Sequence, residues 1–459
     1  MTPNILDALT QAVGSAYVLT DEADLTRYGI DRTTLWQAAP AVVVLPASTA
    51  EVQALVKVAI EHQMAIVPSG GRTGLSGGAV AQHGEMVIAL DRMNTVREFD
   101  PIDRTVTVDA GMITANLQAF AESRQLFYAV DFASSGSSQI GGNIATNAGG
   151  IKVIRYGMTR EQILGLEVVD GHGNCMQLNR GLLKNNSGLD LRHLMIGSEG
   201  ILGIITAATI RLHAPPMESV VMVLGTEQFR DVVTVLDAFN ASMQLSAFEF
   251  FSHNALERVT EHMNLQPPFM TSTPFYALLE FDKADEDRAM TLFEQLLEQG
   301  GVTEGVVSRS LSQARELWRL REDISETLSR WKPYKNDISV RVSRIQDFIV
   351  EVERLIDTVD VGMEVVWYGH IGDGNLHLNI LKAEHQDQAS FRQACTRFSE
   401  RLADLLMRFE GSISAEHGVG LLKKAYLGST RSEQEISLMK QIKQVFDPHG
   451  VMNPGKVFD

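Results

Sequence analysis

The hydrophobic pattern of the first 215 residues alternates short apolar runs with amphipathic stretches. Residues 41–45 are all apolar and predict a buried strand, and residues 52–60 repeat apolar side chains at helical spacing. Ser48 and Glu51 stand before this stretch at the spacing of a capping box, which marks a helix start. The next apolar run, residues 65–67, leads directly into a glycine-rich segment. Strand, helix, strand and glycine loop in this order predict an α/β unit.

Three glycine-rich segments lie in this part of the chain, at residues 68–78, 134–150 and 197–206. Glycine loops expose backbone N–H groups, which bind phosphate, and small side chains let the backbone approach a flat ligand closely. One such loop is commonplace. Three of them predict one large dinucleotide that is held by backbone atoms.

Three local patterns in the chain match other nucleotide or hydrolase motifs only in form. Residues 74–78 fit G-x-S-x-G, but a hydrolase elbow requires a helix directly after the serine, and here the predicted strand 86–90 follows. No G-x-G-x-x-G follows a strand, so a Rossmann NAD site is not supported. Residues 450–456 have P-loop spacing, but Val457 replaces the required Ser or Thr.

The pattern changes after Pro215-Pro216, where amphipathic helices and strands become mixed. The apolar spacing predicts helices over residues 285–299, 314–329 and 391–409. The proline pair therefore indicates a domain boundary. A chain of 459 residues is also too long for one core, and we expect two or three domains.

Metal-type side chains gather in two glycine-flanked clusters near the end of the chain. Alternating apolar residues predict a hairpin that turns at residues 372–375, with His370 and His377 near cross-strand positions, where Cβ atoms are roughly 4.5–5.5 Å apart. Glu416, followed by His417, offers a carboxylate. Two histidines and one carboxylate are the ligands of a catalytic zinc site, which keeps one position open. The alternative is that these are ordinary turn and core histidines.

The amino-acid composition limits the kinds of molecule that the protein is expected to bind. With 40 Lys and Arg against 57 Asp and Glu, the net charge is −17, which argues against nucleic acid or an anionic membrane surface. An anionic substrate then requires a local basic clamp. Only Cys175 and Cys395 are present, so we predict no disulfide framework but two buried free thiols in a reducing compartment. No signal peptide or membrane span is apparent, and we expect a soluble cytoplasmic protein.

The predicted helix over residues 314–329 carries the candidate clamp. Arg321 and Ser325 are four residues apart, hence on one helical face, and Lys335 follows shortly after. The alternative is that these charges belong to a solvated helix face.

Six motifs together resemble the FAD-linked oxidase and dehydrogenase superfamily of the vanillyl-alcohol oxidase fold. They are residues 68–78, 140–150, 197–203, 369–379, 414–420 and 453–456, in the order of that family. The resemblance is strongest to D-2-hydroxyglutarate dehydrogenases, with D-lactate dehydrogenases and the large subunit of glycolate oxidase as relatives.

This resemblance implies an α+β protein with a two-part FAD-binding α/β domain and an α+β cap. The domains would be a lead-in at 1–36, an FAD domain at 37–215, a cap at 216–410 and a C-terminal segment at 411–459 that returns to the FAD domain. The flavin would be non-covalent, since the first two glycine blocks contain no His or Cys. The implied cofactor-binding residues are Pro68, Ser69, Gly70, Gly71, Arg72, Thr73, Gly74, Ser76, Gly77, Ser138, Gly141, Gly142, Asn143, Thr146, Asn147, Gly149, Gly150, Glu199, Gly203, Ile204, Ile205 and Asn453.

The resemblance also implies a substrate pocket. Arg321, Ser325 and Lys335 match an Arg, Thr and Lys that grip a substrate carboxylate; Ser replaces Thr here, and the spacing to Lys335 is one residue shorter. Asn379 and His417 would also contact the substrate, with His417 as the catalytic base. The implied zinc ligands are the two histidines and the carboxylate described above.

The activity expected from the resemblance is oxidation of a D-2-hydroxyacid, D-2-hydroxyglutarate to 2-oxoglutarate in the first place, with hydride transfer to the flavin N5 atom. A D-lactate or glycolate dehydrogenase is the alternative within the branch, and a metal-dependent hydrolase with a nucleotide substrate is the alternative outside it. The expected electron acceptor is an electron-transfer flavoprotein or a quinone, and a homodimer is compatible with the family.

Overall fold

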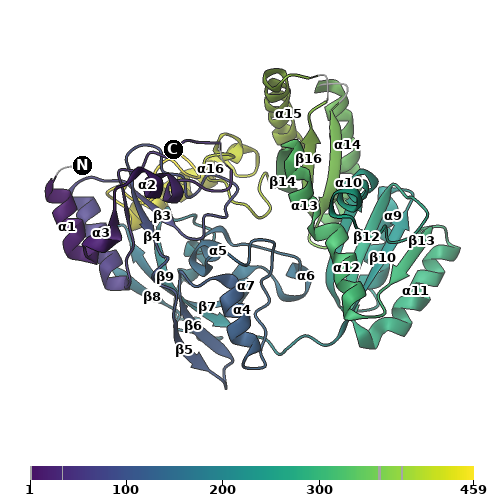
Figure 1. Cartoon of the computed structure of the whole chain (residues 1–459), viewed down its shortest axis with the longest axis horizontal. Helices are drawn as coiled ribbons and strands as arrows, with labels where there is room; N and C mark the ends of the chain where they lie inside the picture. The colour runs from purple at the N-terminus through teal and green to yellow at the C-terminus, as the bar shows by residue number, and fades with distance from the viewer. Residues whose placement is uncertain (1–2, 34, 360–362, 384–385) are drawn as a thin grey trace. The chain divides into compact units, whose positions relative to one another are not determined.

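The computed structural model describes residues 3–33, 35–359, 363–383 and 386–459 (Figure 1). The chain divides into two compact units. The first consists of Met1–Gly150, Gly157–Pro215 and Glu416–Asp459, and the second of Ile151–Tyr156 and Pro216–Ala415. Among the described residues, no helix is both long and apolar enough to cross a membrane.

The first unit contains a four-stranded sheet of order β1-β2-β4-β3. Its strands are β1 (Val18–Leu19), β2 (Val42–Val44), β4 (Met86–Ala89) and β3 (Ile66–Ser69), and the last three run parallel. Parallel strands are buried on both faces, which explains the unbroken apolar run that predicted β2. Helices α1 (Pro3–Val13), α2 (Glu22–Tyr28) and α3 (Thr49–Glu61) belong to this part of the chain.

The predicted start of α3 is confirmed at its N-cap. The Ser48 hydroxyl accepts the Glu51 N–H at 3.2 Å. The Glu51 carboxylate reaches back to accept the Ala47 N–H at 2.7 Å, one residue earlier than a capping box requires.

A second, antiparallel sheet of the first unit has the order β5-β6-β9-β7-β8. Its strands are Val96–Asp100, Thr105–Asp109, Gly203–Arg211, Ile163–Asp170 and Cys175–Leu178 in that order. Helices α4 (Thr114–Glu122), α5 (Ile140–Thr146), α7 (Thr159–Gln162) and α8 (Arg192–Met195) accompany it. Cys175 begins the edge strand β8 and is exposed, so the prediction that both thiols are buried is wrong for Cys175 and confirmed for Cys395.

The C-terminal segment packs into the first unit, beside strands from its N-terminal part (Figure 1). Helix α16 (Glu433–Phe446) starts at a capping box of Ser432 and Glu435, in which both reciprocal bonds are present. After it, Met452 bridges to Ile66 on β3, and the Asn453 N–H donates to the Ile66 carbonyl at 2.8 Å.

The second unit is built on a seven-stranded sheet of order β13-β10-β12-β11-β15-β16-β14. The strands are Glu304–Val307, Ser219–Thr226, Phe275–Asp282, Leu245–Ser252, Glu364–Gly369, Asn375–Leu381 and Tyr334–Ser339 in that order, and every pair is antiparallel. The helices are α6 (Val153–Tyr156), α9 (Phe229–Asn240), α10 (His253–Met263), α11 (Glu286–Glu298), α12 (Leu311–Glu322), α13 (Ile324–Leu328), α14 (Ile345–Val359) and α15 (Gln388–Arg408).

Two sequence predictions about this unit need correction. The predicted helix over 314–329 is interrupted at Asp323, so Arg321 lies on α12 and Ser325 on α13 rather than on one continuous helix. The predicted hairpin exists, but its register pairs His377 with Tyr368. His370 comes one residue after the end of β15 and is not the cross-strand partner of His377.

Candidate active site

The central strand of the candidate site is β16. His377 and Asn379 are two residues apart on it and point to the same face of the sheet. On one side β14 places Asp337 opposite His377 and Lys335 opposite Asn379. On the other side β15 places Tyr368 opposite His377. Neighbouring strands therefore assemble a polar group on one face of the sheet.

Two of the predicted metal ligands come together at the end of this hairpin. The rings of His370 and His377 have centroids 5.2 Å apart. The third predicted ligand, Glu416, is the residue at which the chain re-enters the first unit. Glu416 follows Ala415, whose N–H donates to the Asp337 carbonyl on β14 at 3.4 Å. Two imidazoles and one carboxylate fit Zn²⁺, and binding of an ion stays a prediction.

A buried carboxylate lies next to the Nδ1 atom of each histidine. The Nδ1 atom of His370 lies 2.7 Å from Oε1 of Glu249, and that of His377 lies 3.9 Å from Oδ1 of Asp337. Asn375 donates from Nδ2 to the same Asp337 oxygen at 2.9 Å. Because a carboxylate only accepts, His370 carries its proton on Nδ1, which leaves Nε2 for an ion.

Arg321 is a buried cation in this group, with 5% of its surface exposed. Its Nη2 atom lies 2.8 Å from Oε2 of Glu249, and its guanidinium lies 4.7 Å from the ring centroid of Tyr368. Nε and Nη2 have no aligned hydrogen-bond acceptor among the described residues. A guanidinium with donors left over suits an anionic ligand.

The other predicted substrate residues lie beside Arg321. The Lys335 ammonium donates to the Ser325 hydroxyl at 3.2 Å, so the shorter spacing in the sequence does not separate them. The Tyr368 hydroxyl interacts with Ser325 and Asn379; burial raises the pKa of this phenol, while Ser325, Arg321 and Asn379 act to lower it. The Asn379 Oδ1 atom is buried and has no hydrogen-bond donor among the described residues. The second unit thus gathers Arg321, Ser325, Lys335 and Asn379.

The first unit holds the glycine-rich segments, and the first two of them touch. A Cβ atom added to Gly71 would lie 2.2 Å from the Ser137 carbonyl oxygen, and one added to Gly70 would lie 3.6 Å from the Gly142 Cα. Arg72 adopts φ +60° and pairs with Asp91 at 3.1 Å. Backbone from two distant segments therefore forms one surface.

This surface contains open space and hydrogen-bond acceptors that have no donor among the described residues. A Cβ atom added to Gly142 would meet no heavy atom within 4 Å. The side-chain oxygens of Gln139 and Asn453 are buried without a hydrogen-bond donor among the described residues. Both features fit a large ligand such as FAD, which is bound by close backbone approach and by a few polar groups.

The predicted cofactor residues lie on this surface and around it in the first unit. Pro68 and Ser69 end β3, Ser138 precedes α5, and Gly203, Ile204 and Ile205 begin β9. The residues of the first glycine loop are Gly70, Gly71, Arg72, Thr73, Gly74, Ser76 and Gly77; those in and after α5 are Gly141, Gly142, Asn143, Thr146, Asn147, Gly149 and Gly150.

Glu199 fixes the segment that follows Glu416. Its carboxylate accepts the N–H groups of Val419 at 2.7 Å and Gly420 at 2.8 Å. Asn453 donates from Nδ2 to the Glu199 carbonyl at 2.8 Å. Burial raises the pKa of Glu199 to about 7, against the lowering effect of the two N–H groups and Lys423. Glu199 thereby orders the loop in which His417 lies.

Glu249, Asp337 and Tyr368 are site residues that the sequence did not predict. Glu249 is the one carboxylate in the apolar strand Leu245–Ser252, and such a carboxylate requires a buried partner. That signal was available in the sequence. Tyr368 gives no comparable signal, since an aromatic residue in a strand is ordinary.

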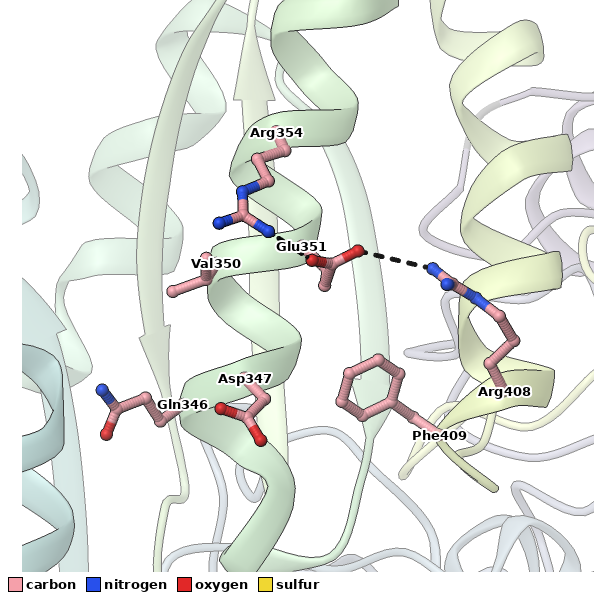
Figure 2. Close-up of a pocket in the computed structure, with 7 residues that line it drawn as sticks. All are labelled: Gln346, Asp347, Val350, Glu351, Arg354, Arg408 and Phe409. Atoms are coloured by element: carbon pink, nitrogen blue, oxygen red, sulfur yellow. Dashed lines mark hydrogen bonds and ion pairs between the residues drawn. The ribbon is translucent and has the colours of Figure 1, made fainter.

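A surface pocket of about 430 Å³ lies elsewhere in the second unit, between α14 and α15 (Figure 2). It is lined by Gln346, Asp347, Val350, Glu351, Arg354, Arg408 and Phe409. Figure 2 shows Glu351 between two arginines, at 2.7 Å from Arg354 and 3.6 Å from Arg408. None of the predicted site residues lies there, and we assign it no role.

Comparison with known proteins identifies the family. Residues 215–457, more than half of the chain, match the C-terminal domain of FAD-linked oxidases, and residues 40–179 match an FAD-binding domain. The chain belongs to the FAD-linked oxidases. This FAD-linked oxidase is an FAD-dependent oxidoreductase, as the sequence predicts.

The sequences of similar proteins align with nearly the whole length of the FAD-linked oxidase. It is 53% identical to D-2-hydroxyglutarate dehydrogenase of Xanthomonas citri pv. viticola, covering 100% of this chain and 97% of that one. It is 50% identical to the protein of the same name from Stutzerimonas stutzeri, covering 99% of each chain. A putative mitochondrial D-lactate dehydrogenase of Schizosaccharomyces pombe is 35% identical over 95% of this chain and 85% of its own.

Solved structures confirm the predicted fold class. p-Cresol methylhydroxylase superposes with a TM-score of 0.79 at 16% identity, over 99% of this chain and 96% of that one. 4-Ethylphenol oxidase from Gulosibacter chungangensis gives 0.78 at 17% identity, also over 99% and 96%. The FAD-linked oxidase has the vanillyl-alcohol oxidase fold, and at these identities the likeness concerns the fold alone.

Proposed function

We propose that this FAD-linked oxidase oxidises D-2-hydroxyglutarate to 2-oxoglutarate. The substrate loses a hydride from C2 and a proton from the C2 hydroxyl. The names of the relatives at 53% and 50% identity support this substrate. The observation that carries the proposal is that Arg321 and Lys335 lie in the same side-chain group as His370 and His377. A dicarboxylate has a second carboxylate for these cations.

The two cations and their neighbours would hold the distal carboxylate. Arg321 offers unused donors, and Lys335 and Ser325 lie in contact with each other. Asn379 would bind the substrate near C1 and C2, since it neighbours His377 on the same face of β16. The alternative substrate within the branch is D-lactate, which carries no distal carboxylate and would leave both cations unused.

His370, His377 and Glu416 would hold a divalent ion, in our proposal Zn²⁺. Such an ion lowers the pKa of a hydroxyl group that binds to it. The chain's own contribution is to fix the Nδ1 proton of His370 with Glu249 at 2.7 Å, so that the ligand nitrogen is unprotonated.

His417 would be the catalytic base that takes the C2 hydroxyl proton on an imidazole nitrogen. A neutral imidazole suits this task near pH 7. Its loop is ordered by Glu199 through the N–H groups of Val419 and Gly420, which limits the directions open to the ring. His417 is also proposed to contact the substrate.

The first unit would hold FAD without a covalent bond, with the residues of the glycine-rich segments named above. FAD supplies the acceptor of the hydride. In this proposal residues 37–215 and the C-terminal segment 411–459 make the FAD domain, residues 1–36 the lead-in, and residues 216–410 the cap for the substrate. We further propose an electron-transfer flavoprotein or a quinone as the next acceptor, a cytoplasmic location consistent with two free thiols, and a homodimer as the oligomer to test.

Anaerobic reduction of the bound flavin tests the substrate. The yellow protein is mixed with D-2-hydroxyglutarate or with D-lactate, and bleaching of the flavin absorbance is followed. We expect fast reduction by D-2-hydroxyglutarate and much slower reduction by D-lactate at equal concentration. Equal rates, or faster reduction by D-lactate, would reject the dicarboxylate assignment.

A further inference from the structure

Glu249 stands at the back of the candidate site, and its contact with His370 is one of two that its carboxylate makes. It lies in the middle of β11, a strand whose eight residues are all buried, and only 1% of its own surface is exposed. A carboxylate at such a position is tolerated only when it is paired. Glu249 is paired twice.

The strand register explains why both partners are in reach. β11 pairs with β15 through Phe250 opposite Gly369 and Phe251 opposite Tyr368. One step further along this antiparallel register, Glu249 reaches the level of His370, directly after β15 ends. α12 brings Arg321 to the same carboxylate from another direction.

Each oxygen of Glu249 has its own partner. Oε1 lies 2.7 Å from Nδ1 of His370, and Oε2 lies 2.8 Å from Nη2 of Arg321. We propose that Glu249 is a positioning residue that holds the metal-ligand histidine and the substrate-binding arginine with one carboxylate. This inference rests on the proposed function, because it assumes an ion at His370 and a dicarboxylate at Arg321.

The double contact has two consequences for the reaction. A proton on Nδ1 of His370 leaves Nε2 as the ligand atom, and the fixed ring keeps that atom in one place. The negative charge also neutralises Arg321, so that this cation stays buried and oriented over the Tyr368 ring before any substrate is bound. His370 and Arg321, which would act at the two ends of the substrate, are thus held at a fixed separation.

Glu249→Gln is the informative variant because it keeps the size of the side chain. A carboxamide has one oxygen and one NH₂ donor, so it cannot present an oxygen to both partners. If the oxygen stays on His370, the NH₂ group faces the guanidinium, donor against donor. If the oxygen turns to Arg321, the NH₂ group donates to Nδ1 of His370, which moves the proton to Nε2 and blocks that atom as a ligand.

A matched control exists on the neighbouring strand β12. Glu280 is also buried, with 6% of its surface exposed. It pairs with Lys152 at 2.6 Å and accepts from the Trp318 indole at 2.8 Å. Glu280→Gln removes a buried ion pair from the same sheet without touching the candidate site.

Three measurements on the full-length FAD-loaded protein test the proposal: thermal unfolding, Zn²⁺ affinity after chelation and titration with Zn²⁺, and KM for D-2-hydroxyglutarate and D-lactate. We expect Glu249→Gln to weaken Zn²⁺ binding or to raise KM for D-2-hydroxyglutarate alone, in either case by about 10- to 100-fold. Glu280→Gln should change Tm but neither binding constant. Glu249→Asp, which keeps both acceptor oxygens, should recover part of the loss.

The outcomes separate the two proposals. Unchanged Zn²⁺ affinity and unchanged KM in a folded Glu249→Gln protein would overturn the positioning role, as would equal losses in Glu280→Gln. If the unaltered protein binds Zn²⁺ but is not reduced by D-2-hydroxyglutarate, the proposed substrate fails. The effect of Glu249→Gln on Zn²⁺ affinity then still decides whether Glu249 positions His370.

Discussion

The candidate sites of the two units consist of different chemical groups. In the first unit the surface consists of backbone, as where Gly71 meets the Ser137 carbonyl and Gly142 leaves open space. In the second unit it consists of charged and polar side chains, which partner one another across strands. The sequence specifies a backbone site through glycine, whose lack of a side chain leaves the backbone accessible. A side-chain site is specified by partners, and those partners can be far apart in the sequence.

The same difference predicts how each site fails. The backbone surface has little charge to lose, so a substitution there acts through steric contact. The side-chain group contains Glu249, Arg321, Asp337 and the histidines in close contact, so removing one member leaves another without its partner. Substitutions in one unit at a time probe this contrast.

The largest effect is expected from His377→Ala in the second unit. It removes one of three proposed ligands, so Zn²⁺ binding and kcat should each fall by more than the roughly 10- to 100-fold that loss of an outer partner causes. Flavin content should stay unchanged, since the first unit is intact. His262→Ala, which alters an exposed histidine of α10, is the control. Full activity of His377→Ala after chelation would contradict a metal site.

A second test concerns the first unit, with two glycines of opposite surroundings. Gly71→Ala drives a Cβ atom against the Ser137 carbonyl oxygen 2.2 Å away, so we expect loss of stability by about 1–3 kcal/mol or more, and loss of FAD. Gly142→Ala meets no atom within 4 Å and lies in α5, where alanine favours the helix by about 0.5–1 kcal/mol.

Gly142→Ala therefore separates cofactor binding from folding. The cofactor-free variant should unfold at an equal or higher temperature than the unaltered protein, while its FAD affinity falls. Calorimetry of the cofactor-free protein and quenching of flavin fluorescence measure the two quantities. Unchanged FAD affinity would show that the open space beside Gly142 is not used by the cofactor.

This contrast also explains what the sequence could predict. The strands β2 and β3, the capping box at Ser432 and the three glycine-rich segments depend on neighbours within a few residues, so local patterns predict them. The hairpin of β15 and β16 was predicted for the same reason. Its register was not: His377 pairs with Tyr368, and His370 follows β15 and contacts Glu249 on β11, 121 residues earlier in the chain.

The missed features share one physical cause. Glu249 belongs to the site because it contacts His370 and Arg321. His370 lies 121 residues later in the chain, and Arg321 lies on another element, α12. The break between α12 and α13 falls at Asp323, with φ −76° and ψ −4°, although the apolar spacing of residues 314–329 predicts one helix. The exposure of Cys175 depends on β8 being an edge strand. A local pattern can show that Glu249 requires a buried partner, but it does not identify that partner.

A smaller effect is expected from Lys335→Met, which tests charge recognition without disturbing the core. Lys335 is exposed on β14, so the fold should tolerate the change. KM for D-2-hydroxyglutarate should rise about tenfold, the size of one lost charged hydrogen bond, while the rate with D-lactate stays unchanged. Arg315→Met on α12 removes an exposed cation outside the site as the control. A parallel change for both substrates would contradict distal carboxylate binding by Lys335.

The last test concerns pH and Glu199, whose carboxylate accepts backbone N–H groups of the first unit. Burial raises the pKa of Glu199 to about 7 in the folded protein, from 4.5 for a free carboxyl group. The folded state therefore binds this proton more tightly than the unfolded state. Its contribution to stability is complete below about pH 4.5 and is lost as the pH rises through about 7, by an amount on the order of 1–3 kcal/mol.

Glu199→Gln removes this titration while keeping one acceptor for the Val419 and Gly420 N–H groups. Tm of the cofactor-free protein should therefore fall less between pH 5 and 7 in the variant than in the unaltered chain, an interval set by the pKa shift above. Glu98→Gln, at an exposed carboxyl on β5, should leave the profile unchanged. If the profiles of Glu199→Gln and the unaltered protein coincide, Glu199 does not titrate in this interval. Glu199 would then be no exception to the contrast between the two units.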